Sequence, residues 1–141
     1  MGHSSIIITA RFSPDETLVV TASGDGTAKL WDAETGEALR TMAGLVGAVI
    51  NAEFSPDGTR ILTMSLETAS VWDLQGRELA TLTSDSASLF TYVSWSPDGR
   101  YILACYRDGS AMLWDSISWD ALKALGTEFD TLEELVSRWS P

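Results

Sequence analysis

One block of sequence occurs three times in this 141-residue chain, and that repetition limits the folds open to it. The segment Phe12-Ser13-Pro14-Asp15 recurs 42 residues later as residues 54–57, and 41 residues further on as Trp95-Ser96-Pro97-Asp98. A Trp-Asp pair follows in each copy, at residues 31–32, 72–73 and 114–115. A period of about 40 residues indicates a repeat architecture, in which each unit buries its apolar faces against its neighbours.

Each copy has the pattern of four short strands joined by tight turns. The first apolar run ends at the aromatic residue, and the Ser-Pro-Asp-Gly turn follows, with Glu16 in place of Gly in the first copy. The second run is apolar at consecutive positions, which indicates a sheet that is covered on both faces. The expected first strands are residues 6–12, 49–54 and 90–95, the second 18–22, 61–64 and 101–105, and the fourth 38–42, 79–82 and 121–125, with the third strands around the Trp-Asp pairs. The pattern predicts an all-β fold of three four-stranded antiparallel propeller blades.

The chain resembles the WD-repeat β-propeller family over residues 2–126, and three copies in register make that resemblance specific. The first copy matches best, with Gly2-His3, the turn Ser23-Gly24-Asp25-Gly26-Thr27 and then Leu30-Trp31-Asp32. The resemblance implies blades at about residues 2–43, 44–84 and 85–126, followed by a tail at 127–141. It also implies a hydrogen-bonded chain through His3, Ser23 or Thr21, Asp25 and Trp31, with a structural role. The third copy keeps Asp108 and Trp114 but offers them no His.

The residues of that expected chain also allow a rival interpretation as a nucleophilic triad of His3, Asp25 and Ser23. Against it, the Ser would lie within a strand, and no loop that could form an oxyanion hole accompanies it. One His and one Cys are too few ligands for a zinc site. Cys105 lies in an apolar strand, as a buried free thiol usually does. The turn at residues 24–27 precedes a strand and not a helix, so it is not a phosphate loop. We expect no enzyme activity, no metal and no cofactor.

The charge balance narrows the choice of partners. The chain has 20 acidic residues against 9 Lys and Arg, a formal net charge of −11. Nucleic acids and anionic membranes are bound by clustered Lys and Arg, so neither is expected as a partner. A single Cys and the lack of a signal-like segment predict a cytoplasmic protein.

Three blades do not make a ring, since propellers close with about 4–8 of them. The blade faces at both ends would stay bare, which soluble monomers rarely tolerate. In a first explanation identical chains join head to tail, so that a dimer gives six blades or a trimer gives nine. In a second, the chain is a piece of a larger propeller. In a third, the tail caps a monomeric arc.

The tail differs from the repeats. Apolar residues at 129, 132, 135, 136 and 139 follow a helical period, and Thr131 with Glu134 or Asp130 with Glu133 fits a capping box. The expected C-terminal helix would pack on a blade or on a partner. The tail also resembles the ends of WD-repeat regions in bacterial multidomain signalling NTPases, whose propellers act as sensors.

The function expected from these features is that of a non-enzymatic protein- or peptide-binding scaffold that completes its ring by self-association. Alternatives are a fragment of a sensor propeller and a purely structural self-assembling unit. The acidic charge predicts a basic or neutral protein ligand. The resemblance implies a binding face that includes Phe90, Tyr92, Tyr106, Arg107 and Leu66. Alternation along the first strands directs Thr9, Arg11, Asn51 and Glu53 towards a central channel.

Overall fold

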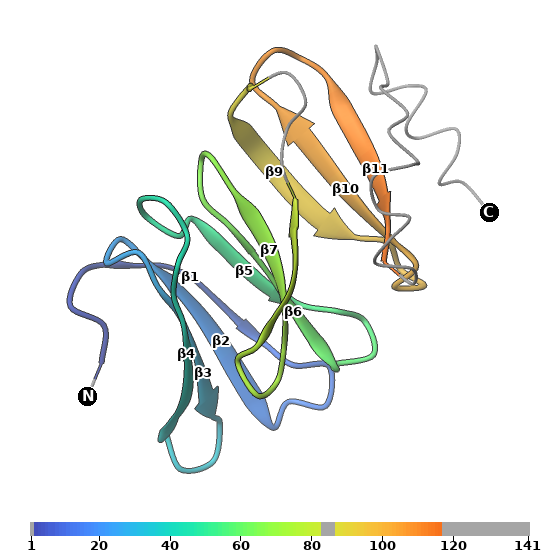
Figure 1. Ribbon diagram of the computed structural model, residues 1–141. Coiled ribbons are helices and arrows are strands. Elements are labelled where there is room, and N and C mark those ends of the chain that lie inside the picture. The colour runs from blue at the N-terminus through green and yellow to red at the C-terminus, as the bar shows by residue number, and fades with distance from the viewer. Residues whose placement is uncertain (1, 83–86, 117–141) are drawn as a thin grey trace.

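The computed structural model describes residues 2–82 and 87–116, and the regular structure in this part of the chain is antiparallel β (Figure 1). The first sheet contains β1 (Ile7–Phe12), β2 (Leu18–Ser23), β3 (Ala28–Asp32) and β4 (Ala38–Met42), in that order. The second contains β5 (Asn51–Phe54), β6 (Arg60–Met64), β7 (Ala69–Asp73) and β8 (Glu78–Leu82). The third contains β9 (Phe90–Trp95), β10 (Tyr101–Tyr106) and β11 (Ala111–Asp115). The prediction of an all-β fold of antiparallel sheets is confirmed, with four strands in the first two sheets and three described strands in the third. The expected strand at 121–125 and the expected C-terminal helix lie outside the described residues.

The Ser-Pro-Asp turn is held by its own side chains in every copy. In the first copy, Asp15 Oδ1 accepts bonds from Ser13 Oγ at 2.7 Å and from the Thr17 backbone N–H at 3.0 Å. Ser13 Oγ in turn accepts the Leu18 N–H at 3.0 Å. The same bonds recur around Asp57 and Asp98. The buried Ser and the ionised Asp therefore fix the link between the first and second strands.

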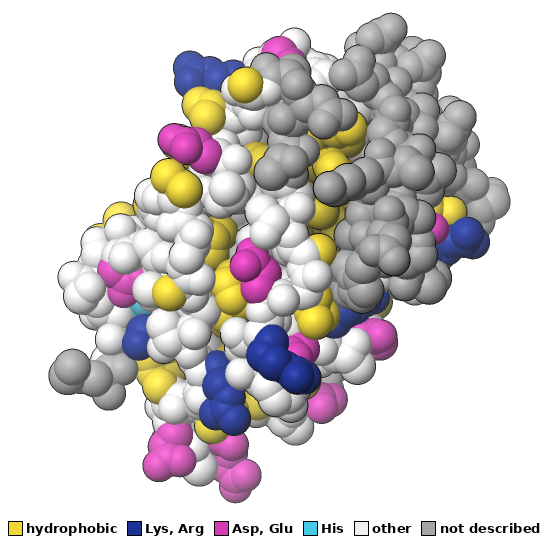
Figure 2. All heavy atoms as spheres, in the orientation of Figure 1, with side chains coloured by type: hydrophobic (Ala, Val, Ile, Leu, Met, Phe, Trp, Pro, Cys, Tyr) yellow, Lys and Arg dark blue, Asp and Glu magenta, His cyan; other side chains and the backbone are white. Residues whose placement is uncertain are grey.

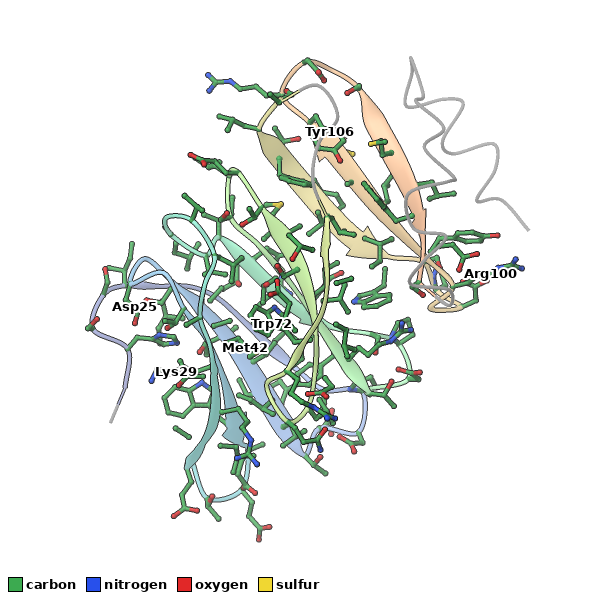
Figure 3. All side chains as sticks on the ribbon, viewed as in Figure 1. Asp25, Lys29, Met42, Trp72, Arg100 and Tyr106 are labelled. Carbon is green, nitrogen blue, oxygen red and sulfur yellow. The ribbon has the colours of Figure 1, made fainter. Side chains whose placement is uncertain are left out.

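The sheets are stacked face to face, and their cores lie between them. One cluster joins the first and second sheets and includes Val20, Met42, Phe54 and Trp72 (Figure 3). Another joins the second and third sheets through side chains such as Val71. The second sheet is thus covered on both faces, which explains why its second strand is apolar at consecutive positions.

The first sheet has a neighbour on one face and a bare flank on the other. Phe12 is 66% exposed, whereas the residues at the same position in the other sheets, Phe54 and Trp95, are 9% and 8% exposed. Ile7, at the start of the same strand, is 55% exposed. The flank of the first sheet is therefore an apolar surface like those buried elsewhere in the molecule.

Glu16 occupies a turn position that suits glycine. Its φ is 62°, and the equivalent residues Gly58 and Gly99 have φ values of 73° and 72°. A side chain in this left-handed region is strained by about 1 kcal/mol or more. We expect Glu16→Gly to raise the free energy of unfolding by about 1 kcal/mol, measured by urea denaturation.

The matched control for that variant is Gly58→Ala, which introduces the same strain in the second sheet. Its new Cβ would lie 3.4 Å from Pro14 Cδ, an ordinary contact, so strain and not collision is tested. Gly58→Ala should be destabilised by a similar amount. Equal stability of all three proteins would show that the turn conformation is not strained.

Candidate functional site

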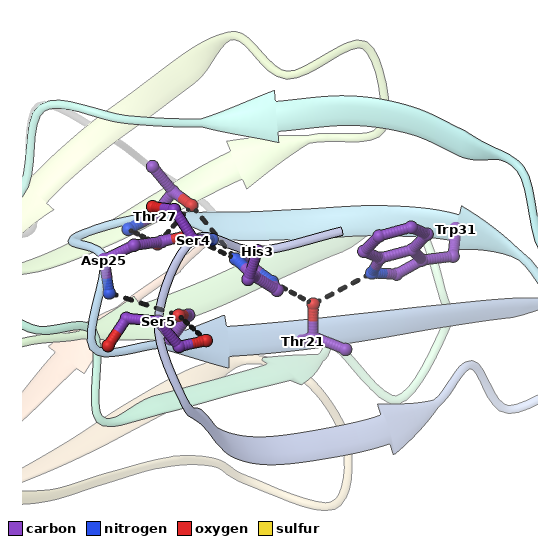
Figure 4. Close-up of polar contacts among 8 residues, drawn as sticks. His3, Ser4, Ser5, Thr21, Asp25, Thr27 and Trp31 are labelled. Atoms are coloured by element: carbon purple, nitrogen blue, oxygen red, sulfur yellow. Dashed lines mark hydrogen bonds and ion pairs between the residues drawn. The ribbon is translucent and has the colours of Figure 1, made fainter. Parts of the chain in front are cut away.

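Four side chains of the first sheet and the segment before it form a continuous chain of hydrogen bonds (Figure 4). Trp31 Nε1 donates to Thr21 Oγ1 over 2.8 Å, and His3 Nε2 lies 2.6 Å from the same oxygen. On the other side of the imidazole, His3 Nδ1 lies 2.9 Å from Asp25 Oδ2. Since the indole only donates, the Thr21 hydroxyl can donate to Nε2 of a neutral His3, whose Nδ1–H then donates to Asp25. The chain ties the N-terminal segment to β2 and β3.

Asp25 is the carboxylate of this hydrogen-bond network, and both of its oxygens accept hydrogen bonds. Its Oδ1 accepts from Thr27 Oγ1 at 2.7 Å and from the Thr27 backbone N–H at 2.9 Å. Its Oδ2 accepts the Ser4 N–H at 3.0 Å, and its side chain is 8% exposed. Burial alone would raise the pKa of Asp25, but the bonds from Thr27, His3 and Ser4 outweigh it and hold that pKa well below its usual range.

Ser23 is not part of this hydrogen-bond network, because its hydroxyl bonds to other groups. Ser23 Oγ donates to the Ser5 carbonyl at 3.4 Å and accepts the Asp25 N–H at 3.1 Å. His3 Nε2 is directed at Thr21 instead, and the His3 side chain is 1% exposed. No substrate can reach an imidazole placed in this way, so the geometry does not support a nucleophilic triad.

The later copies keep less and less of the arrangement. In the second sheet, Trp72 Nε1 donates to Thr63 Oγ1 over 2.8 Å. In the third, Ala104 stands at that Thr position, and the buried Nε1 of Trp114 has no hydrogen-bond partner within the described residues. Asp108 instead accepts bonds from the N–H and hydroxyl of Ser110. Asp108 and Trp114, expected in one network, are therefore not joined by a shared hydroxyl.

The expected binding face is divided between surface and core. Leu66 and Tyr92 are 51% and 53% exposed, and Arg107 is also exposed. Phe90 and Tyr106 are buried, at 0% and 4% exposed, and their rings stack with centroids 4.9 Å apart. Placing these two on the binding face is wrong. Phe90 reaches the core because a β-bulge in β9, between the pairs Cys105–Tyr92 and Tyr106–Phe90, breaks the alternation of that strand. Tyr106 reaches it because it alternates regularly with the buried Ile102 and Ala104 in β10, and its hydroxyl donates to Met112 Sδ at 3.6 Å.

Two exposed residues that the sequence did not single out lie at the same end of the sheets as Leu66. The Ile6 carbonyl accepts the Gly24 N–H in the turn between β2 and β3, and Val46 lies in the loop between β4 and β5. The Leu66 carbonyl accepts the Phe90 N–H, which fixes the turn between β6 and β7. Ile6 is 72% and Val46 53% exposed. We call Ile6, Val46, Leu66 and Arg107 the turn face.

The four residues expected at a channel lie on the inner strands β1 and β5, and they differ in their contacts. Glu53 Oε1 accepts the Trp95 backbone N–H at 3.1 Å and so joins β5 to β9. Burial raises the pKa of Glu53, against the opposing effects of that hydrogen bond and of the charge on Arg11. Arg11 is exposed, Asn51 is half-buried, and the buried Thr9 Oγ1 has no hydrogen-bond partner within the described part of the chain.

Other kinds of site find little support in the same residues. Within 2–82 and 87–116, no three His, Cys, Asp or Glu side chains are grouped as a metal ion requires. Burial raises the pKa of the half-buried Cys105 thiol. The described segments contain no helix with the length and apolarity that crossing a bilayer demands.

These stacked antiparallel sheets, each with a tryptophan in the third strand of its repeat, define a class of repeat protein. The family model described as "WD domain, G-beta repeat" matches residues 1–32 and 76–115, about half of the chain. The chain belongs to this WD-repeat family, as the resemblance implied.

Two of the curated proteins to which the chain is similar come from fungi. Eukaryotic translation initiation factor 3 subunit I of Aspergillus oryzae is 32% identical over 145 residues, covering 93% of this chain and 43% of the relative. The protein of the same name from Pyricularia oryzae is 35% identical over 137 residues, covering 88% and 40%. The chain thus spans about two fifths of the length of these relatives.

The expected ring-closing homodimer or homotrimer is wrong in light of these relatives. Each is named as one subunit of a translation initiation factor, which favours different proteins as partners over copies of one chain. Of the two blade faces expected to be bare, the one on the first sheet exposes Phe12, which is 66% accessible. A bare apolar flank, however, does not specify which polypeptide covers it.

The unpaired indole of Trp114 provides a stability test. Each copy pairs this position of the second strand with the first strand, as Ala10–Thr21, Ala52–Thr63 and Val93–Ala104. Val93 therefore fills the volume that Thr takes in the other copies. We expect Val93→Ala/Ala104→Thr to be more stable than Val93→Ala by about 1–3 kcal/mol, because Trp114 gains an acceptor. Urea denaturation measures the difference.

The matched control for that variant is Thr63→Ala, which should lose about 1–3 kcal/mol by leaving Trp72 unpaired. In the double variant the Trp114 indole N–H should also exchange more slowly with solvent, as followed by NMR. An unchanged exchange rate would mean that the introduced hydroxyl does not bond the indole.

Asp25 predicts a dependence of stability on pH. Its pKa is lower in the folded chain than the unfolded value of about 3.9, so its contribution is present above about pH 4 and is lost as pH falls below it. We expect Asp25→Asn to be less stable than the natural chain by about 1–3 kcal/mol at neutral pH. Denaturation curves from neutral to acid pH should show this gap closing below about pH 4.

The exposed Glu67 supplies the comparison, as Glu67→Gln changes one carboxylate outside the network. A gap for Asp25→Asn that stayed constant with pH would remove the ionised carboxylate from the account. A loss of the same size in Glu67→Gln would do so too.

Proposed function

We propose that this chain is a non-catalytic WD-repeat module that binds another protein through the turn face. The observation that carries the proposal is the exposure of Ile6, Val46 and Leu66, at 72%, 53% and 51%, at one end of adjoining sheets. Exposed apolar side chains gathered at one end of a molecule are a feature of protein interaction sites, and Arg is enriched at protein interfaces.

The turns that carry these side chains are held in place before any partner arrives. The Val49 N–H donates to the Ser23 carbonyl at 3.0 Å, which anchors the loop carrying Val46 to the neighbouring turn. The Arg107 N–H donates to the Leu89 carbonyl at 2.8 Å. A surface fixed in this way loses little conformational entropy on binding, so more of the contact free energy appears as affinity.

A catalytic role has less support. Both nitrogens of His3 are committed to Thr21 and Asp25, and the side chain is buried. Glu53 is bonded to the backbone of the neighbouring sheet and serves its packing. Neither group has the access to substrate that general acid–base catalysis requires.

The names of the relatives suggest the kind of assembly in which the chain acts and its location in the cell. We extend to this chain the role of a subunit in a multi-protein assembly, as part of a scaffold, and a cytoplasmic location in keeping with translation factors. The acidic composition, with a net charge of −11, is consistent with a protein partner and not a nucleic acid.

The turn face is tested by placing charge on it. In Val46→Asp/Leu66→Asp, two exposed aliphatic side chains become carboxylates, which should reduce partner capture by at least about tenfold while the melting temperature changes little. Proteins retained by immobilised natural and variant chains from a eukaryotic extract are compared by quantitative mass spectrometry. Proteins lost only with the variant are then purified, and their affinities are measured.

The control carries the same change on another surface. Leu79, on the outer strand β8, is 38% exposed, and Leu79→Asp should retain the partners of the natural chain. Equal loss in Leu79→Asp, or full retention in the turn-face variant, would contradict docking on the turn face.

A further inference from the structure

Arg60 fastens the second sheet to the third at the end where the Ser-Pro-Asp turns lie. Its Nη1 donates to the Ser116 carbonyl at 2.7 Å, and its Nη2 lies 3.4 Å from the Gly99 carbonyl. The guanidinium carbon lies 4.6 Å from the centroid of the Trp95 ring. The third sheet therefore binds the guanidinium of Arg60 through stacking on an aromatic ring and through two backbone carbonyls that accept hydrogen bonds.

The first sheet carries a copy of that site on its bare flank. Aligned on the repeat, Trp95, Gly99 and Ser116 correspond to Phe12, Glu16 and Ala33. The backbone frames agree, since the Ala33 N–H donates to the Thr17 carbonyl at 3.0 Å as the Ser116 N–H donates to the Arg100 carbonyl at 2.8 Å. These residues line a depression of about 520 Å³, which we call the flank pocket: Phe12, Glu16, Thr17, Asp32, Ala33 and Glu34.

The flank pocket is open where its counterpart is filled. Phe12 is 66% exposed, against 8% for Trp95 beneath Arg60. Three of the residues that line the flank pocket are acidic: Glu16, Asp32 and Glu34. Acidic side chains gather over the turn between β3 and β4, at the lower left of the space-filling view (Figure 2). The shape and the negative charge of the flank pocket therefore both suit a planar cation.

Asp32 differs from its counterparts in lacking a cationic partner. Arg77 Nε lies 2.7 Å from Asp73 Oδ2, and Arg100 Nε lies 3.9 Å from Asp115 Oδ2. The first sheet has Glu37 and Thr17 at the positions of these arginines. Across residues 2–82 and 87–116, no Lys or Arg lies within ion-pair distance of Asp32.

We propose that the flank pocket binds the guanidinium of an arginine side chain from a different polypeptide that packs on the bare flank of the first sheet. The arginine would stack on Phe12 and donate to the carbonyls of Glu16 and Ala33, as Arg60 does at Trp95. A lysine lacks the planar donor set that this geometry uses. A second copy of this chain would present Tyr101 at the position of Arg60, so it does not supply the arginine. This site lies on a surface separate from the turn face.

The side-chain probe for this site is methylguanidinium, titrated into the ¹⁵N-labelled chain and followed by NMR. We expect saturable shifts of the Thr17, Ala33 and Glu34 amides, with a dissociation constant on the order of 10 mM for so small a ligand. Methylammonium carries the same charge but is not planar, so it should bind at least about threefold more weakly than methylguanidinium. Equal shifts with both ions, or no saturable shifts with methylguanidinium, would overturn the proposal.

Two variants with a charge-matched control locate the binding. Phe12→Leu removes the ring but keeps an apolar side chain, and should weaken binding about two- to fivefold. Glu34→Gln should weaken it about two- to threefold at low salt. Glu37→Gln, on the same turn but outside the pocket, should leave the dissociation constant unchanged. Equal weakening in Glu34→Gln and Glu37→Gln would mean non-specific attraction to the acidic surface, against the proposal.

The equivalence of the two sites is tested in the third sheet. In Arg60→Leu, with the residue that the first sheet has at this position, methylguanidinium should also shift the Gly99 and Ser116 amides. In the natural chain those amides should not respond, because Arg60 fills the site. Absence of the second set of shifts in a folded Arg60→Leu variant would contradict the equivalence on which the proposal rests.

Discussion

The structure depends on apolar packing between neighbouring sheets, which aromatic residues at equivalent positions make possible. Trp72 and Trp114 are 4% and 6% exposed, and each contributes to the cluster beneath the preceding sheet. At about 25 cal/mol per Å² of apolar surface, a buried aromatic side chain is worth several kcal/mol to the stacked arrangement. Each sheet buries apolar side chains against its neighbour, so a face without a neighbour leaves apolar surface exposed to water, as Phe12 shows. The turns, the inner strands and the flank pocket all take their positions from this stacking.

The strands could be predicted well from the sequence because the same strand and turn pattern occurs three times, and each copy supports the assignment in the others. The second strand expected at 18–22 is observed at Leu18–Ser23, and the first strand expected at 90–95 is observed at Phe90–Trp95. Side-chain direction near strand ends was harder to predict. Phe90 precedes a bulge in β9, which brings its side chain into the core beside Tyr106, and a bulge leaves no trace in the hydrophobic pattern. The pattern of residue types likewise could not decide between Ser23 and Thr21, because both hydroxyls can accept an indole N–H.

The identity of what covers the flank could not come from the sequence for a different reason. Composition and periodicity indicate how much apolar surface a sheet exposes. Either a copy of the chain or another protein can cover that surface equally well. The residues that discriminate are polar and lie at the edge of the interface. Arg60 was not singled out because an Arg at the start of a strand usually extends into solvent, and its contacts with Ser116 and Trp95 appear only when two sheets are brought together.

The interfaces between successive sheets differ in their chemistry, although the repeats that form them are alike. Between the first and second sheets, Leu18 and Leu74 pack against the shared core at the place where the next interface has Arg60 and Ser116. The next interface adds a second polar contact on the inner strands, where Glu53 accepts the Trp95 N–H. Polar contacts contribute little net stability, but a mismatched partner would leave a buried charge unpaired, which is costly. The polar contacts between the second and third sheets therefore favour this pairing over a mismatched one. By the same reasoning, the carboxylates around Phe12 disfavour an uncharged neighbour on the bare flank and favour one that carries an arginine.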